Sequence, residues 1–149
     1  MKIFIVSCVF LSLLLGCVST TTMSLEQKNQ AVSEYIADGN VSSKDRVHGF
    51  VFSGWKPLSD NYLIVTSVYK KDYLIQTKGR CFGLDDTQHI KLNRSSNLSI
   101  FIIGDSISPI GGRGAKCYIK AIYPITSAQT DHLVSICLLY TSPSPRDSD

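Results

Sequence analysis

The residues with the clearest chemistry in this 149-residue sequence are its five cysteines, and Cys17 stands in the most informative context. Cys17 directly follows Gly16 at the end of an apolar run over residues 3–15, and Lys2 precedes that run. A positive charge, a short apolar run and a small residue before the cleavage point are the features of a secretory signal peptide. The run is too short for a transmembrane helix, which needs about 20 apolar residues. Residues 1–16 are therefore predicted to be a signal peptide.

The step Leu14-Leu15-Gly16-Cys17 resembles the signal of a bacterial lipoprotein, in which the cysteine is lipidated and becomes the first mature residue. A lipid on Cys17 would anchor the chain to a membrane outside the cytoplasm. Val18, rather than an aspartate, follows the cysteine, and this resembles the signal for sorting to the outer membrane. We therefore expect a lipid-anchored protein of the bacterial cell envelope, held on the outer membrane and facing the periplasm.

The sequence from Cys137 to Asp147 resembles one reading frame of a sequencing adapter translated with the rest of the chain. The alternative is a genuine disordered tail, because the serines and prolines alone would fit one. The length of the match favours the adapter, so residues 137–149 are interpreted as a non-native tail and excluded. What remains is enough for a lipidated tether with a short helix over residues 17–44 and one small β domain over residues 45–130.

Cys81 and Cys117 are the pair left when the cysteines of the signal, the anchor and the tail are set aside. In an exported protein an even pair of cysteines is read as a disulfide by default. Closing a loop of this length would remove unfolded-state entropy equivalent to about 4 kcal/mol. The alternative is a metal or redox pair, but no Cys-x-x-Cys motif is present and no histidine lies at ligand spacing. A structural disulfide is predicted.

The remaining polar residues do not form a recognisable catalytic or metal-binding pattern. His48, His89 and His132 are far apart, whereas zinc sites usually contain a close pair of ligands. Asp85 and Asp86 are adjacent and could bind a hard cation, but a calcium loop alternates its oxygen ligands along the chain, so Asp85 is read as a turn or cap residue. No serine lies in a Gly-x-Ser-x-Gly elbow. We predict no catalytic residue, no metal and no cofactor, and the mild net charge of +3 implies no nucleic-acid partner.

Four aromatic residues are the candidates for a ligand-binding cleft: Trp55, with Phe50, Phe52 and Tyr62. Aromatic side chains on the strands of so small a domain are more often part of the core. The core interpretation is therefore favoured, and the cleft is kept as an alternative.

The elements that must position these residues are one helix and a series of short strands. Ser24 and Gln27 fit a capping box, and apolar residues follow at helical spacing until Gly39. From Arg46 onward, short β-branched and aromatic runs alternate with turns. Residues 54–61 are read as a turn that carries Trp55, and residues 98–103 are read as a buried run. We predict a mainly β, α+β fold: a short N-terminal helix followed by a small antiparallel sheet of about six strands, curved or barrel-like, with one disulfide.

Five short motifs occur together in order between Gly54 and Pro124. Jointly they resemble an uncharacterised family of proteobacterial envelope lipoproteins, the domain of unknown function numbered 6491. The resemblance covers residues 45–126 and implies one compact domain with a bond between Cys81 and Cys117, but it lends no activity or substrate. The motifs are Gly54-Trp55-Lys56-Pro57-Leu58, Tyr73-Leu74, Cys81 with Leu84, Asp105-Ser106-Ile107, and Cys117-Tyr118-Ile119-Lys120-Ala121-Ile122 with Pro124.

The function that these observations favour is non-catalytic. We expect a membrane-anchored module whose disulfide-linked domain binds another envelope component, with the membrane itself contacted through the lipid on Cys17. One alternative is a periplasmic hydrolase whose Asp and His residues come together only in the fold. The other is a small-ligand carrier that uses the aromatic cleft around Trp55.

Overall fold

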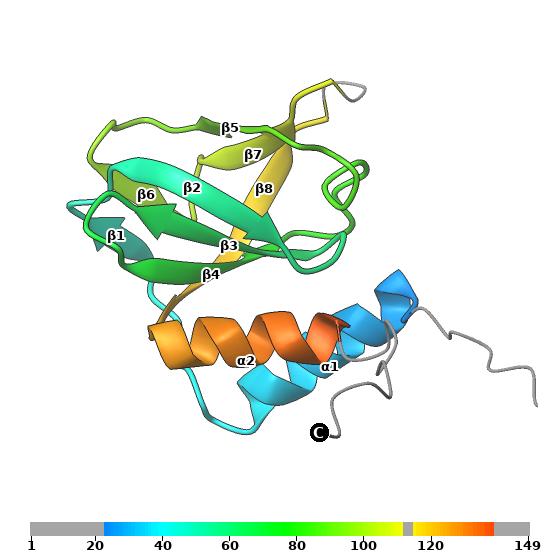
Figure 1. Cartoon of the computed structure of the whole chain (residues 1–149). Coiled ribbons are helices and arrows are strands. Elements are labelled where there is room, and N and C mark those ends of the chain that lie inside the picture. Colours follow the sequence, from blue (N-terminus) through cyan, green and yellow to red (C-terminus); the bar gives the residue numbers. More distant parts are fainter. Residues whose placement is uncertain (1–22, 112–114, 139–149) are drawn as a thin grey trace, which may run out of the picture.

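The computed structural model describes residues 23–111 and 115–138, which form two layers (Figure 1). One layer is an antiparallel sheet curled into a half-barrel, and the other is a pair of helices that covers the outer face of this sheet. In chain order the elements are α1 (Leu25–Ala37), β1 (Arg46–His48), β2 (Phe52–Pro57), β3 (Tyr62–Ser67), β4 (Asp72–Thr77), β5 (Ile90–Asn93), β6 (Ser99–Phe101), β7 (Ser106–Pro109), β8 (Cys117–Ile125) and α2 (Ser127–Leu138).

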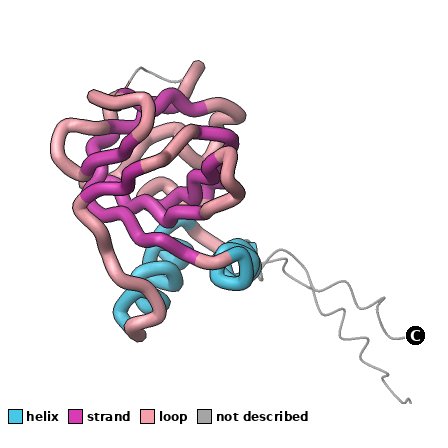
Figure 2. The backbone as a smooth tube through the Cα atoms, turned by 90° about the vertical axis from the view of Figure 1, so that its left-hand side faces the viewer, coloured by secondary structure: helices cyan, strands magenta, loops and turns pink. Residues whose placement is uncertain are grey.

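The main sheet has six strands in the order β2-β3-β4-β8-β7-β5, with every neighbouring pair antiparallel. β1 and β6 form a separate two-stranded ribbon, which the bridge between Lys44 and Ile122 links to β8. Figure 2 shows the strands wrapping around a common interior, with both helices on one side. The prediction of a short helix followed by a small, curved antiparallel sheet with one disulfide is confirmed.

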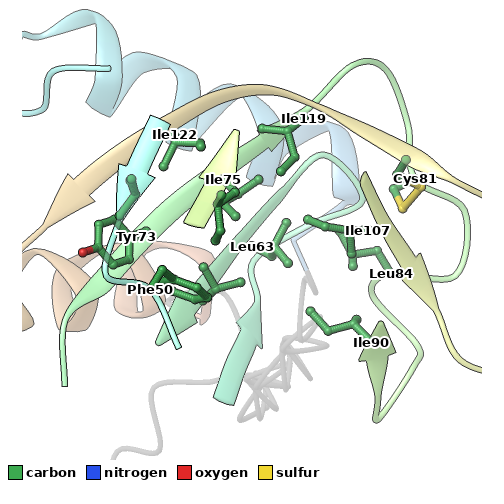
Figure 3. Close-up of a cluster of buried hydrophobic side chains, with 14 residues drawn as sticks. Phe50, Leu63, Tyr73, Ile75, Cys81, Leu84, Ile90, Ile107, Ile119 and Ile122 are labelled. Carbon is green, nitrogen blue, oxygen red and sulfur yellow. A yellow bond between two sulfur atoms is a disulfide. The ribbon is translucent and has the colours of Figure 1, made fainter. Parts of the chain in front are cut away.

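The inner core lies between the half-barrel and the ribbon (Figure 3). Successive side chains of a strand point to opposite faces, so Leu63, Val65, Ile75 and Ile119 all reach this interior. Val47 of β1 and Ile100 of β6 pair across the ribbon and close the core from the other side. The ribbon therefore covers the inner core on the side that the half-barrel leaves open.

A second core fills the space between the outer face of the sheet and the helices. Its buried members include Ile64 and Leu74 from the sheet, Val32 from α1 and Leu133 from α2. These residues alternate with the inner set along β3 and β4, which makes both strands apolar on both faces. Neither of the two helices in the described ranges is long and apolar enough to cross a bilayer.

α1 begins as the sequence predicts. The Ser24 side chain accepts a hydrogen bond from the Gln27 backbone N–H at 3.2 Å, and the Gln27 side chain accepts one from the Ser24 N–H at 2.9 Å. This reciprocal pair satisfies two N–H groups that the first turn of a helix leaves free. Val32 is the one fully buried residue of α1.

α2 was not predicted. Thr126 and Gln129 form a second reciprocal cap, because each backbone N–H donates to the side-chain oxygen of the other residue. The helix contributes Leu133 and Cys137 to the outer core, so Cys137 and Leu138, which we assigned to the non-native tail, are the last residues of α2. Residues 139–149 lie outside the described part of the chain.

Two sequence-based assignments of local structure were wrong. Residues 54–61 are not simply a turn, because Trp55 lies within β2 and pairs with Val65 of β3. The glycine and proline that suggested a turn are accommodated, since Gly54 follows a bulge and Pro57 ends an edge strand. The run from Leu98 to Ile103 is not wholly buried, because its two end residues are exposed.

Candidate interaction surface

The predicted disulfide joins the loop after β4 to the start of β8. The Cys81 and Cys117 sulfurs are bonded at 2.02 Å, and both residues are buried against the inner core. The Cys81 backbone N–H also donates to the carbonyl of Asp60 at 2.7 Å, which links this loop to the β2–β3 turn. The disulfide lies in the core, and its two sulfurs are too buried to exchange with an external thiol.

The four aromatic candidates do not form one cleft. Phe50 is fully buried in the inner core, and Phe52 and Trp55 pack against the same core. Tyr62 belongs to the outer core on the other face of the sheet. Burial raises the pKa of the Tyr62 phenol, with a smaller opposing contribution from its hydrogen bond to Ser33. These positions agree with the interpretation of the four aromatic residues as part of the core.

The buried carboxylates are engaged in holding the fold together. Asp60 accepts a hydrogen bond from the Asn29 side chain at 2.7 Å and forms an ion pair with the Arg80 Nε at 3.2 Å. Asp105 accepts hydrogen bonds from the backbone N–H groups of Phe101 and Ser95 at 2.8 and 3.1 Å. The carboxylate oxygens of both residues therefore accept hydrogen bonds from neighbouring segments of the chain.

The three histidines occupy three separate places. His48 lies 3.2 Å from the Ser99 hydroxyl, and its ring meets the ring of Phe101 edge-on. His132 lies against Tyr35 between the two helices, with 5.3 Å between ring centroids. His89 directly precedes β5. Across the described ranges no three His, Cys, Asp or Glu side chains are placed to hold one metal ion.

A surface hollow, named the disulfide-end cleft, lies beside the loop that follows Cys81. It has a volume of about 360 Å³ and lies between the turn after Cys81 and the end of β7. Asp86, Thr87, His89 and Ile110 are among the residues that line it. The Thr87 hydroxyl lies 2.8 Å from the backbone carbonyls of both His89 and Ile110, so it is held by the backbone and is not poised as a nucleophile.

The ribbon groove is a second hollow, with a volume of about 400 Å³ along the β1–β6 ribbon. Asp45, Arg46, Phe101, Ile102 and Ile103 line it. Ile103 is 85% exposed, the largest exposed fraction among the large apolar residues of the described ranges. The groove thus combines one exposed aliphatic side chain with one exposed charge of each sign, from Asp45 and Arg46.

Sequence reasoning missed this groove because residues 98–103 have the composition of a buried strand. The available signal was Gly104-Asp105, which ends the run and places Ile103 in a turn. Gly104 has a φ of +90°, a conformation that glycine adopts without strain. Ile103 is thereby held on the surface by a well-defined backbone.

Arg94 couples the ribbon side of the molecule to the inner core. Its guanidinium donates to the Phe50 carbonyl at 3.1 Å and lies 5.5 Å from the centre of the Phe50 ring. Burial lowers the pKa of this guanidinium, and the charge of Asp105 acts in the opposite direction. The group remains charged near neutral pH, as arginine does in proteins.

The predicted lipidation residue, Cys17, lies outside the described residues.

The comparisons with known proteins identify a family but give no information about function. No curated protein and no solved structure matches the chain. The model of the family described as "Family of unknown function (DUF6491)" matches residues 1–135, a longer span than the motifs had suggested. The chain therefore belongs to the DUF6491 family.

Proposed function

We propose that this chain is a lipid-anchored module of the bacterial cell envelope, attached to the outer membrane through Cys17 and facing the periplasm. Its β domain binds another envelope protein and does not catalyse a reaction. The sequence supports the anchor through the signal and the Leu14-Leu15-Gly16-Cys17 step. The observation that carries the binding role is the ribbon groove, with Ile103 exposed beside Arg46 and Asp45.

The position of the ribbon fits this role. The first turn of α1 and the β1–β6 ribbon lie at opposite ends of the molecule (Figure 1). Since the lipidated residue precedes α1, the anchor holds one end of the domain and leaves the ribbon end directed away from it. An apolar groove in that position is accessible to a partner protein in the periplasm.

A partner of matching chemistry would offer an apolar side chain to Ile103 and Phe101. It would also meet one charge of each sign, from Arg46 and Asp45. Such rim charges contribute mainly to the specificity and rate of association, whereas the buried apolar contact supplies most of the affinity. A protein surface with an exposed aliphatic or aromatic anchor meets these requirements.

A hydrolase remains the second candidate, because one observation favours it. Asp86 and His89 line the same disulfide-end cleft, as an Asp/His site assembled by the fold would require. The carrier alternative has lost its main support, since Tyr62 lies on the opposite face of the sheet from Trp55. Replacing Asp86 and His89 together with Asn would abolish any hydrolysis that depends on this cleft.

The test of the binding role is a cross-linking pull-down of the full-length chain from intact cells. We expect one abundant envelope protein, which Ile103→Ser reduces several-fold. Ile110→Ser is the matched control, because Ile110 is also exposed but belongs to the disulfide-end cleft. Equal recovery from both variants would show that the ribbon groove is not the binding surface.

The test of the anchor uses two cysteine variants. Cys17→Ala should move the protein from the membrane fraction to the soluble fraction, whereas Cys8→Ala should leave it on the membrane because Cys8 lies within the signal. Continued tight membrane association of Cys17→Ala would disprove lipid anchoring at this residue. The same variant serves as the pull-down control, since a partner that is met only at the membrane is lost with the anchor.

A further inference from the structure

Two exposed aromatic residues flank the disulfide at the end of the molecule opposite to the ribbon. Phe82 directly follows Cys81 and is 75% exposed, and Tyr118 directly follows Cys117 and is 48% exposed. The disulfide holds the two segments together, and the Lys78 N–H donates to the Tyr118 carbonyl at 2.8 Å. The two rings therefore belong to one rigid end of the domain.

This end is fixed to the first turn of α1 by charged contacts. Arg80, two residues before Phe82, pairs with Glu26 of α1 at 3.0 Å and with Asp60 at 3.2 Å. Glu26 is the second residue of the helix, so the point where the chain enters α1 lies beside the aromatic end. The helix and the disulfide loop are thus neighbours although they are more than 50 residues apart in sequence.

The length of the tether limits how far this end can be from a bilayer. If Cys17 carries the lipid, as the proposed function assumes, it lies six positions before Met23, where the described structure begins. Six extended residues span at most about 20 Å. The end that carries Phe82 and Tyr118 is consequently the end of the domain that the anchor holds closest to the membrane.

We propose that the anchor-side surface, formed by Lys78, Phe82, Lys116 and Tyr118, rests on the bilayer that holds the Cys17 lipid. Aromatic rings favour the headgroup region, because they are apolar with a polarisable or polar edge. Lys78 and Lys116 are exposed, and neither takes part in an ion pair within the described part of the chain. Their flexible stems allow the charges to reach phosphate groups while the rings insert.

The acidic residues near this surface set the depth of the contact. Asp85 and Asp86 are exposed in the turn after Phe82 and have to stay hydrated. Phe82 therefore enters the headgroup layer and not the centre of the bilayer, at about the depth of an interfacial anchor, 5–10 Å. The contact fixes the orientation of the domain, with the ribbon groove directed into the periplasm.

The test measures quenching of tryptophan fluorescence by brominated acyl chains in liposomes of phosphatidylethanolamine and phosphatidylglycerol that carry the full lipidated chain. Phe82→Trp places a probe on the anchor-side surface. Tyr69→Trp is the matched control, because Tyr69 is 67% exposed in the turn at the opposite end of β4. Trp55 contributes the same background to both variants. We expect quenching several-fold stronger for Phe82→Trp than for Tyr69→Trp.

The outcomes separate this proposal from the anchor on which it rests. Flotation of the same liposomes shows whether the chain is anchored at all, and protein that fails to float overturns the proposed anchor. Protein that floats but shows equal, weak quenching in both variants overturns the membrane contact alone. In that case the exposed aromatic end is available to a protein instead of to the lipid surface.

Discussion

The carboxylate of Asp105 lies 2.8 Å from the backbone nitrogen of Phe101 and accepts its hydrogen bond. The other carboxylate oxygen accepts from the backbone N–H and the hydroxyl of Ser95. Asp105 is 1% exposed and directly precedes β7, while Phe101 ends β6. One side chain therefore fixes the ribbon and the 94–98 loop to the main sheet, which explains the aspartate of the Asp-Ser-Ile motif in structural terms.

Asp105→Ala should be strongly destabilising, because it removes the buried acceptor of three hydrogen bonds, from the backbone N–H groups of Phe101 and Ser95 and from the Ser95 hydroxyl. We expect a loss of about 3 kcal/mol in the free energy of unfolding, measured by urea denaturation. Asp85→Ala is the control, since Asp85 is exposed and should change the stability by less than about 0.5 kcal/mol. Similar urea midpoints for the two variants would contradict the structural role of Asp105.

The Cys81–Cys117 bond closes a loop with a sequence separation of 36 residues. Replacing both cysteines with serine should lower the free energy of unfolding by about 4 kcal/mol, since the unfolded chain regains the entropy of the open loop. Reduction of the wild-type protein in urea, where the bond is accessible, followed by refolding with the reductant present should produce a similar loss. The double variant should not respond to the reductant, and a response from it would point to another redox-sensitive group.

The contacts of Asp60 hold the first half of α1 against the sheet. Asn29 donates to one carboxylate oxygen of Asp60 and Arg80 donates to the other, while the Ser59 hydroxyl donates to Asn29. α1 has few buried apolar residues of its own, so these polar contacts carry much of its docking.

Asp60→Ala should therefore loosen α1 before it unfolds the domain. We expect the amide protons of α1 to exchange about 30-fold faster, as a loss of about 2 kcal/mol in local stability implies. Glu34→Ala removes an exposed contact with Gln30 within the helix and should have little effect. Exchange that accelerates equally in α1 and in β3 would mean that the whole domain, and not the helix, has been destabilised.

The parts of the fold that the sequence predicts are those that rest on local signals. The Ser24–Gln27 cap, the short strands from Arg46 onward and the pairing of Cys81 with Cys117 were all recognisable. α2 carried the same kind of signal in Thr126 and Gln129, but most of its apolar residues lie in its second half, which runs into the segment excluded as a tail.

The faces of the sheet could not be assigned from the sequence, because they depend on register. Trp55 pairs with Val65 and shares its inner face only because a bulge shifts the register before Gly54. Tyr62 lies three residues before Val65, and the alternation of side chains places it on the outer face. The four aromatic residues therefore do not share one face of the sheet, which agrees with the favoured core interpretation. The exposure of Ile103 depends on the turn at Gly104, which the apolar run itself does not indicate.

Cys137 gives a chemical test of the position of α2. Its thiol is buried in the outer core, and this burial raises its pKa from 9.0 to about 11, with Lys28 acting weakly in the opposite direction. In a chain that begins at Val18, and so lacks Cys8 and Cys17, Cys137 is the only cysteine outside the disulfide. A disulfide reagent such as DTNB should label it slowly at pH 8 in buffer and rapidly in urea, because the thiolate is the reactive form.

The same pKa shift predicts how stability depends on pH. Between pH 9 and pH 11 the folded state keeps the Cys137 proton that the unfolded state loses, so stability falls as the pH rises through this range. The loss should reach about 2–3 kcal/mol, and burial of Tyr62 and Tyr123, which raises their pKa values, adds to it above pH 10. Cys137→Ala should flatten the decline between pH 9 and pH 10 while the tyrosine contribution remains. An unchanged slope in that variant, or equally fast labelling of the folded and unfolded chains, would place Cys137 outside the core.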